Sequence, residues 1–136
     1  MTARKTHARR KREPAAAPVV EVDFAKMAAR IASDNRAEDI VILDLRGLTS
    51  IADYFVIATG ISDRQLRAIA DELEAKGKAV GQKPFQISGY ENTAWVLVDF
   101  VDVVVHLFDR EHRDYYDLEL LWGDAPRIDW EPAAKA

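Results

Sequence analysis

Residues 95–100 read Trp-Val-Leu-Val-Asp-Phe, and residues 103–108 read Val-Val-Val-His-Leu-Phe, with a two-residue turn between them. Short apolar runs that are this rich in branched side chains predict two buried strands. Because side chains alternate along a strand, Trp95, Leu97 and Asp99 should share one face of the first strand. Both faces of that strand are nevertheless mostly apolar, so both need cover. A helix is expected on one side, and a partner protein is a candidate for the other.

The composition predicts one packed domain with short tails. The chain has 136 residues, of which 49% are hydrophobic, enough for one core but not for a two-domain enzyme. It has no cysteine, which excludes disulfides, thiolate metal sites and a cysteine nucleophile. No apolar run approaches the roughly 20 residues that span a bilayer. We therefore expect a soluble, cytoplasmic protein that does not contact a membrane.

Charge is distributed unevenly along the chain. Residues 1–13 hold six bases and one acid, which leaves 13 bases and 22 acids elsewhere, a net charge of −9. Acidic surfaces repel phosphate and attract basic proteins, so the body should bind protein rather than nucleic acid. Residues 1–22 have too few apolar side chains to fold, which predicts a disordered basic arm with at most weak RNA contact. An organellar targeting segment is the alternative, and Pro14 and Pro18 argue against it.

Hydrophobic periodicity predicts a single α/β domain over residues 23–122. Residues 24–31 carry an apolar stripe at helical spacing after the capping residue Asp23. A second helix should follow the second strand, and a third should follow the last strand. The expected strands are residues 40–45, 53–59, 85–88, 95–100 and 103–108. The result is a mixed sheet of about five strands flanked by helices, and residues 123–136 are expected to form an extended tail.

The loop around Gly60 joins a strand to a helix and could cradle a phosphate on its backbone N–H groups. Asp63 lies in the first helical turn, where its carboxylate already satisfies the positive end of the helix dipole and would repel an anion. The sequence therefore favours a capping box, in which Ser62 and Gln65 cap the helix, over a phosphate site.

Two groups of polar side chains could bind a metal, and each also has a structural interpretation. Asp99 and Asp102 could form a carboxylate pair of the kind that a nucleotidyltransferase uses, but their position at a strand turn favours ordinary turn acids. His106 could join Asp109 and His112. A histidine within so apolar a strand is more often a hydrogen-bonded core residue, and no ligand spacing supports a metal site.

Aromatic side chains are concentrated in the second half of the chain. Most large rings are buried, and this is the expectation for most of the set Tyr90, Phe100, Tyr115, Tyr116 and Trp122. Trp95 is the exception, because it opens a strand directly after a polar turn and lies beside acids. An exposed ring among charges is typical of a protein-binding hot spot.

Six segments of the chain form a pattern that is more specific than any single motif. They are residues 37–44, 53–60, 89–90, 95–99, 102–106 and 116–122. They include Asp-Tyr-Phe-Val-Ile-Ala-Thr-Gly at 53–60 and Trp-Val-Leu-Val-Asp at 95–99. In order and spacing, from Phe24 to Trp122, these segments resemble the ribosomal silencing factor family, also called Iojap-related proteins. The two tails lie outside this range and inherit nothing from the resemblance.

The resemblance implies a non-catalytic translational repressor that uses no cofactor. Members of the family bind the free large ribosomal subunit through its ribosomal protein numbered fourteen and block joining of the small subunit, which slows translation when nutrients are short. Their fold resembles that of nucleotidyltransferases, so a nucleotide-binding enzyme of that type is one alternative. A factor that assists assembly of the large subunit is another. An apolar patch on a small domain also makes a homodimer an expectation.

Carried over to this chain, the resemblance places the partner contact on the strand that begins at Trp95. The candidate contact residues are Trp95, Leu97, Asp99, Phe100, Asp102 and Tyr90. The apolar side chains would supply the buried area, and the two acids would pair with basic residues of the partner. Side-chain alternation turns Phe100 away from Leu97 unless the strand end bends. No catalytic or metal-ligating residue is expected.

Overall fold

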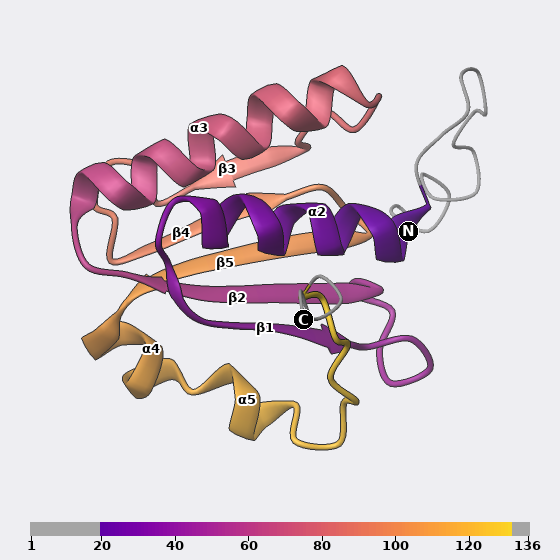
Figure 1. The fold of residues 1–136 in the computed structure, drawn as a ribbon. Coiled ribbons are helices and arrows are strands. Elements are labelled where there is room, and N and C mark those ends of the chain that lie inside the picture. The colour runs from indigo at the N-terminus through magenta and orange to yellow at the C-terminus, as the bar shows by residue number, and fades with distance from the viewer. Residues whose placement is uncertain (1–19, 132–136) are drawn as a thin grey trace, which may run out of the picture.

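Five strands form one mixed sheet in the computed structural model, which describes residues 20–131 (Figure 1). The strands are β1 (Glu38–Asp44), β2 (Tyr54–Gly60), β3 (Gln86–Ser88), β4 (Trp95–Asp99) and β5 (Val103–Asp109). Their order across the sheet is β1-β2-β5-β4-β3. β2 and β5 are parallel, and the other neighbours are antiparallel. The predicted α/β fold with a mixed five-stranded sheet is confirmed.

The two central strands are the most apolar part of the chain. All seven residues of β2 are buried, and so are the first six of β5. A continuous apolar run needs cover on both faces, which the centre of a sheet provides. The parallel pairing of β2 with β5 also requires a long crossover. Helix α3 (Asp63–Ala79), β3 and β4 supply it.

Helices α2 (Glu21–Asp34) and α3 lie together on one face of the sheet (Figure 1). The larger core cluster fills the space between these helices and the strands. In it the ring of Phe24 meets the ring of Phe100 edge-on, with 4.7 Å between centroids. Residues 1–19 of the predicted arm, with their predicted RNA contact, lie outside the described residues, and Glu21 and Val22 of that arm belong to α2. Within residues 20–131, no helix combines the length and hydropathy that crossing a bilayer requires.

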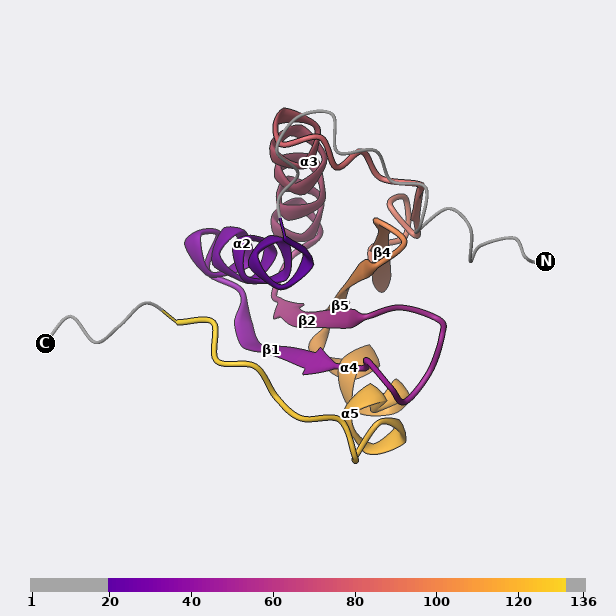
Figure 2. The same ribbon diagram turned by 90° about the vertical axis from the view of Figure 1, so that its right-hand side faces the viewer.

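Two short helices, α4 (Arg110–Tyr116) and α5 (Leu118–Leu121), lie on the opposite face of the sheet (Figure 2). The sequence predicted one continuous helix here, and this prediction is wrong. The break falls at Asp117, whose φ of 47° is left-handed, so the chain turns instead of continuing the helix. A second core cluster, which includes Phe55 and Phe108, lies beneath the two helices.

The segment after Trp122 runs in extended form along the outer edge of β1 (Figure 2). The backbone N–H of Asp44 donates to the carbonyl of Pro126 at 2.8 Å. The N–H of Ile128 donates to the carbonyl of Ile42 at 3.0 Å. These bonds cover an edge that would otherwise expose unpaired backbone groups. The packed unit therefore continues beyond the boundary that the sequence predicted at Trp122.

Candidate functional site

One face of β4 is only partly covered. Trp95, Leu97 and Asp99 are half-buried on this face, whereas Val96 and Val98 on the other face are fully buried. The predicted alternation along the strand is thus confirmed. Helix α4 packs mainly against β5 and β2, so β4 lies at the margin of its cover. We refer to Trp95, Leu97 and Asp99 together as the β4 face.

The indole of Trp95 is held in place on three sides. Its ring lies 4.9 Å from the ring of Phe108 and 4.5 Å from that of Tyr116, measured between centroids. Its Nε1–H donates a hydrogen bond to Nδ1 of His106 at 3.1 Å. Trp95 is therefore both a packed residue and a surface residue, with its polar edge turned inward.

His106 is a buried, neutral core histidine, as the sequence predicted. It is 4% exposed, and its ring lies 4.3 Å from that of Phe55. Burial lowers the pKa of His106 to about 3, because the charged form would lose its hydration. Nδ1 of His112 contacts Oδ1 of Asp109 at 2.8 Å, but Nδ1 of His106 is bonded to Trp95, and among the described residues these three do not form a ligand group.

Acidification should weaken the fold through His106. Its pKa is about 3 in the folded protein and 6.5 in its ordinary state, so the unfolded chain binds an extra proton between these values. The stability linked to this histidine is complete above about pH 6.5 and falls as the pH is lowered toward about 3. Lowering the pH from about 7.5 to about 5 should remove about 2 kcal/mol from the free energy of unfolding. Urea titrations at both pH values measure the loss, and an equal loss in His106→Leu would assign it to other groups.

Two tyrosines of α4 are more exposed than the sequence predicted. Tyr115 is 77% exposed and Tyr116 is 43% exposed, although both were expected in the core. On α5, Leu120 and Leu121 are exposed as well. The break at Asp117 explains this result, because two short helices cannot present one continuous buried stripe. Tyr116 joins the β4 face through its contact with Trp95.

Burial corrects two members of the predicted contact set. Phe100 is 3% exposed and packs on Phe24 beneath α2, so it belongs to the core. Asp102 is 2% exposed and is equally inaccessible to a partner. Tyr90 is separated from the β4 face, because it packs against the core cluster on the α2 and α3 side of the sheet. Its hydroxyl donates to Asp71 of α3 at 3.0 Å.

The carboxylates of Asp99 and Asp102, which were considered as a metal-binding pair, are engaged in different places. Oδ1 of Asp99 accepts the backbone N–H of Val101 at 2.7 Å. This bond supports a tight turn in which Val101 has a φ of 77°, a strained value for a branched residue. Asp99 is thus a turn acid, as the sequence favoured. Asp102 instead lies with Glu21 and Asp53, whose carboxylate oxygens fall within 4.8 Å of one another.

The loop after β2 is closed by its own side chains. Oγ of Ser62 accepts the N–H of Gln65 at 3.1 Å, and Oε1 of Gln65 accepts the N–H of Ile61 at 2.6 Å. The carboxylate of Asp63 accepts the hydroxyl of Thr93 at 2.7 Å. The predicted cap from Ser62 is confirmed, whereas the Gln65 side chain bonds to the residue before the N-cap and not to Ser62. Two of the N–H groups that a phosphate would need are used within the loop.

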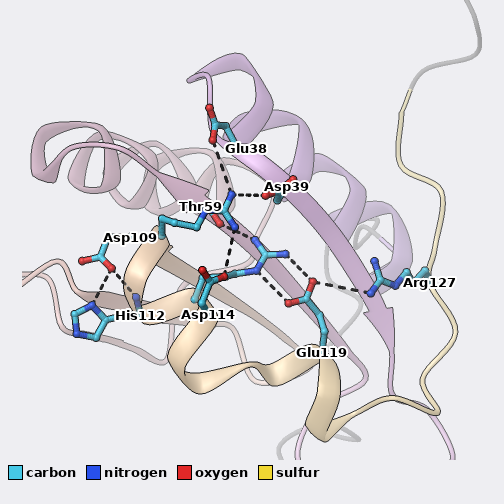
Figure 3. A network of polar contacts seen from close by, with 10 residues as sticks. Glu38, Asp39, Thr59, Asp109, His112, Asp114, Glu119 and Arg127 are labelled. Carbon is cyan, nitrogen blue, oxygen red and sulfur yellow. Dashed lines mark hydrogen bonds and ion pairs between the residues drawn. The ribbon is translucent and has the colours of Figure 1, made fainter.

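A buried arginine ties α4 and α5 to the sheet (Figure 3). Arg113 is 5% exposed, and its guanidinium donates to Oγ1 of Thr59 on β2 at 2.8 Å. It also donates two bonds to the carboxylate of Glu119 on α5, at 3.1 and 2.7 Å. Around it, Arg110 pairs with Asp39 at the surface. Sequence reasoning missed this network, which fixes the helix that carries Tyr116.

The fold and the site define an acidic α/β domain in which the β4 face, with its aromatic residue Trp95, is only partly covered by helices. A sequence model of the family described as "Ribosomal silencing factor during starvation" matches residues 19–136. The chain belongs to this family, and the resemblance seen in the sequence is confirmed. The family is named for a regulatory activity on the ribosome.

Individual relatives agree with this assignment. Ribosomal silencing factor RsfS of Bacillus subtilis is 48% identical over 104 residues, which cover 76% of this chain and 88% of the relative. Protein Iojap, chloroplastic, of Zea mays is 35% identical over 122 residues, 82% of this chain and 52% of the relative. The crystal structure of a Chromobacterium violaceum protein that is 38% identical matches with a TM-score of 0.74, covering 86% of this chain and 98% of that one.

Proposed function

We propose that this protein represses translation by docking on the large ribosomal subunit through the β4 face, where it blocks joining of the small subunit. The partner would be the ribosomal protein numbered fourteen, as the family resemblance implies. One observation carries the proposal: Trp95 and Leu97 are half-buried on a strand that the helices leave partly uncovered, in a domain of the ribosomal silencing family. The mechanism is steric and needs no catalytic group.

The chemistry of the β4 face fits a basic protein partner. Trp95, Leu97 and the neighbouring Tyr116 offer apolar area, and rings of this kind dominate the energy of protein interfaces. The net charge of −9 outside residues 1–13 steers a basic protein toward the domain and disfavours RNA. Most of the surface of this domain should therefore repel ribosomal RNA and attract a basic ribosomal protein.

Sedimentation through a sucrose gradient tests the docking step. The protein is mixed with separated ribosomal subunits and with joined ribosomes, and we expect it to comigrate with the large subunit alone. Val80→Ala is the control, since Val80 is 38% exposed and lies at the C-cap of α3, across the sheet from the β4 face. Comigration with the small subunit or with joined ribosomes would contradict the proposal.

Subunit joining tests the repressor step separately. Light scattering follows the association of purified subunits, and adding the protein should lower the extent of joining in proportion to the large subunits that it occupies. Binding without inhibition would exclude the steric mechanism and leave docking intact.

Docking should weaken as salt is added, because salt screens the attraction between Asp99 and a basic partner. Asp99→Asn removes that charge but keeps an oxygen that can accept the Val101 N–H, so the turn should survive. We expect affinity for the large subunit to fall by about 3-fold to 10-fold and its salt dependence to flatten, because rim charges act mainly on association rates. Titrations at several ionic strengths measure both effects. An unchanged salt dependence in the variant would assign the steering to other acids.

We further propose that the free protein self-associates through the same face, which would bury Trp95 and Leu97 in the absence of the ribosome. Sedimentation velocity over a range of concentrations measures this equilibrium. Large subunits should compete with it, since both complexes would use the same side chains.

A further inference from the structure

The polar edge of Trp95 faces a buried histidine instead of solvent. Tryptophan Nε1 can only donate, so Nδ1 of His106, 3.1 Å away, must be the acceptor and carries no proton. The proton of the neutral imidazole is therefore on Nε2. This assignment fixes the tautomer of a histidine that lies between Val105 and Leu107 on a central strand.

The second nitrogen of His106 makes this residue costly for the fold. Nε2 is buried, and it has no hydrogen-bond partner in the part of the chain that the structure describes. An unpaired buried donor is rare in native cores and destabilises them. An apolar side chain would suit the position better, because its neighbours on β5 are Val, Leu and Phe. The contact that an apolar residue could not make here is the hydrogen bond accepted from Trp95.

The hydrogen bond selects one orientation of the indole. The rings of Phe108 and Tyr116 contact Trp95 and limit its tilt. Stacking alone would still allow the indole to turn over about χ2, since this torsion has broad wells. The Nε1–H bond to His106 excludes the reversed orientation, because the donor would then leave its acceptor. Two kinds of contact thus act together to hold one pose.

We propose that His106 is a positioning residue that locks Trp95 in the orientation that meets the ribosomal partner. This inference rests on the proposed docking function. Because the indole N–H is already bonded inside the domain, the partner meets the apolar surface of the ring and not a hydrogen-bond donor. Holding the ring before contact removes the entropic cost of ordering it during docking.

Two variants of His106 test the lock. His106→Leu removes the acceptor at similar volume, and affinity for the large subunit should fall about tenfold. The melting temperature should change little, because losing the unpaired Nε2–H offsets leaving the indole N–H without an acceptor. His106→Asn offers an oxygen close to the former Nδ1 and should restore binding to within about threefold. If the leucine variant does not fold, His106→Val replaces it. Wild-type affinity in a folded apolar variant would overturn the proposal.

A double-mutant cycle separates positioning from general damage. Trp95→Phe has no N–H, so adding His106→Leu to it should cause no further loss of affinity. An equal loss in both backgrounds would show that His106 acts on the fold and not through the indole. Near-ultraviolet circular dichroism gives a readout without ribosomes, since a freed indole should lose its ordered signal.

The variants distinguish a failure of the positioning role of His106 from a failure of docking through Trp95. If Trp95→Ala binds the large subunit as tightly as the wild type while folded, docking does not use Trp95 and the inference about His106 fails with it. If Trp95→Ala loses binding and His106→Leu does not, docking stands and only the role of His106 is rejected.

Discussion

Replacing Trp95 by alanine is expected to weaken binding to the large ribosomal subunit by about a hundredfold or more. The indole is the largest apolar side chain on the β4 face, and truncation of a central tryptophan at an interface commonly costs about 2–4 kcal/mol. Titration of labelled protein with large subunits measures the change. Val80→Ala removes an exposed apolar side chain on the α3 side of the sheet and should bind normally.

The same substitution should also destabilise the domain. The indole contacts Phe108 and Tyr116 and bonds to His106, so its loss removes packing as well as a docking surface. We expect a decrease of about 1–3 kcal/mol in the free energy of unfolding. Binding must therefore be measured at a temperature where the variant is fully folded. Trp95→Phe keeps an aromatic ring and should lose less affinity and less stability than Trp95→Ala. A folded Trp95→Ala with wild-type affinity would remove Trp95 from the interface.

Much of the fold could be predicted because its signals are local. β2 and β5 have no polar face, so the sequence predicts strands that are buried on both sides, as they are. The cap of α3 depends on two residues three positions apart, Ser62 and Gln65, and the structure forms the predicted bond. The alternation along β4 likewise separates Trp95 from Val96. Each of these features depends on neighbours within one helix or strand.

The errors in the candidate site all depend on contacts between distant segments. Phe100 was placed in the contact set because it follows the β4 strand, but α2 lies over it. Asp102 seemed an exposed turn acid, yet the chain packs it beside Glu21 and Asp53. Tyr115 is exposed because the helix stops at Asp117, and a single left-handed residue has no reliable signal in one sequence. Spacing alone cannot show which element covers which strand.

The buried arginine was the least predictable feature. Arginine is usually exposed, so its burial at position 113 contradicts the ordinary expectation. Its partner Glu119 is six residues away, which is not a spacing that pairs side chains on one helix. The pair forms only because α4 ends and α5 begins between them, so the ion pair and the helix break have the same origin.

Arg113→Ala should be the most destabilising single substitution among the polar residues discussed. The guanidinium bonds to Thr59 and twice to Glu119, so its removal leaves a partly buried carboxylate and a buried hydroxyl without their donor. Breaking a buried ion pair from one side costs about 3–5 kcal/mol. The Glu119 side chain is 23% exposed and lies 3.9 Å from Arg127, which places the expected loss near the lower end. Urea unfolding measures it.

Two further variants serve as controls for Arg113→Ala. Arg110→Ala breaks a surface ion pair with Asp39 and should cost at most about 1 kcal/mol, because exposed pairs are screened by water. Arg113→Met combined with Glu119→Leu removes both charges together and should recover much of the loss. If Arg113→Ala costs no more than Arg110→Ala, the network does not hold α4. If it costs more and also weakens docking at a temperature where the variant is folded, Arg113 supports the helix that sets Tyr116 against Trp95.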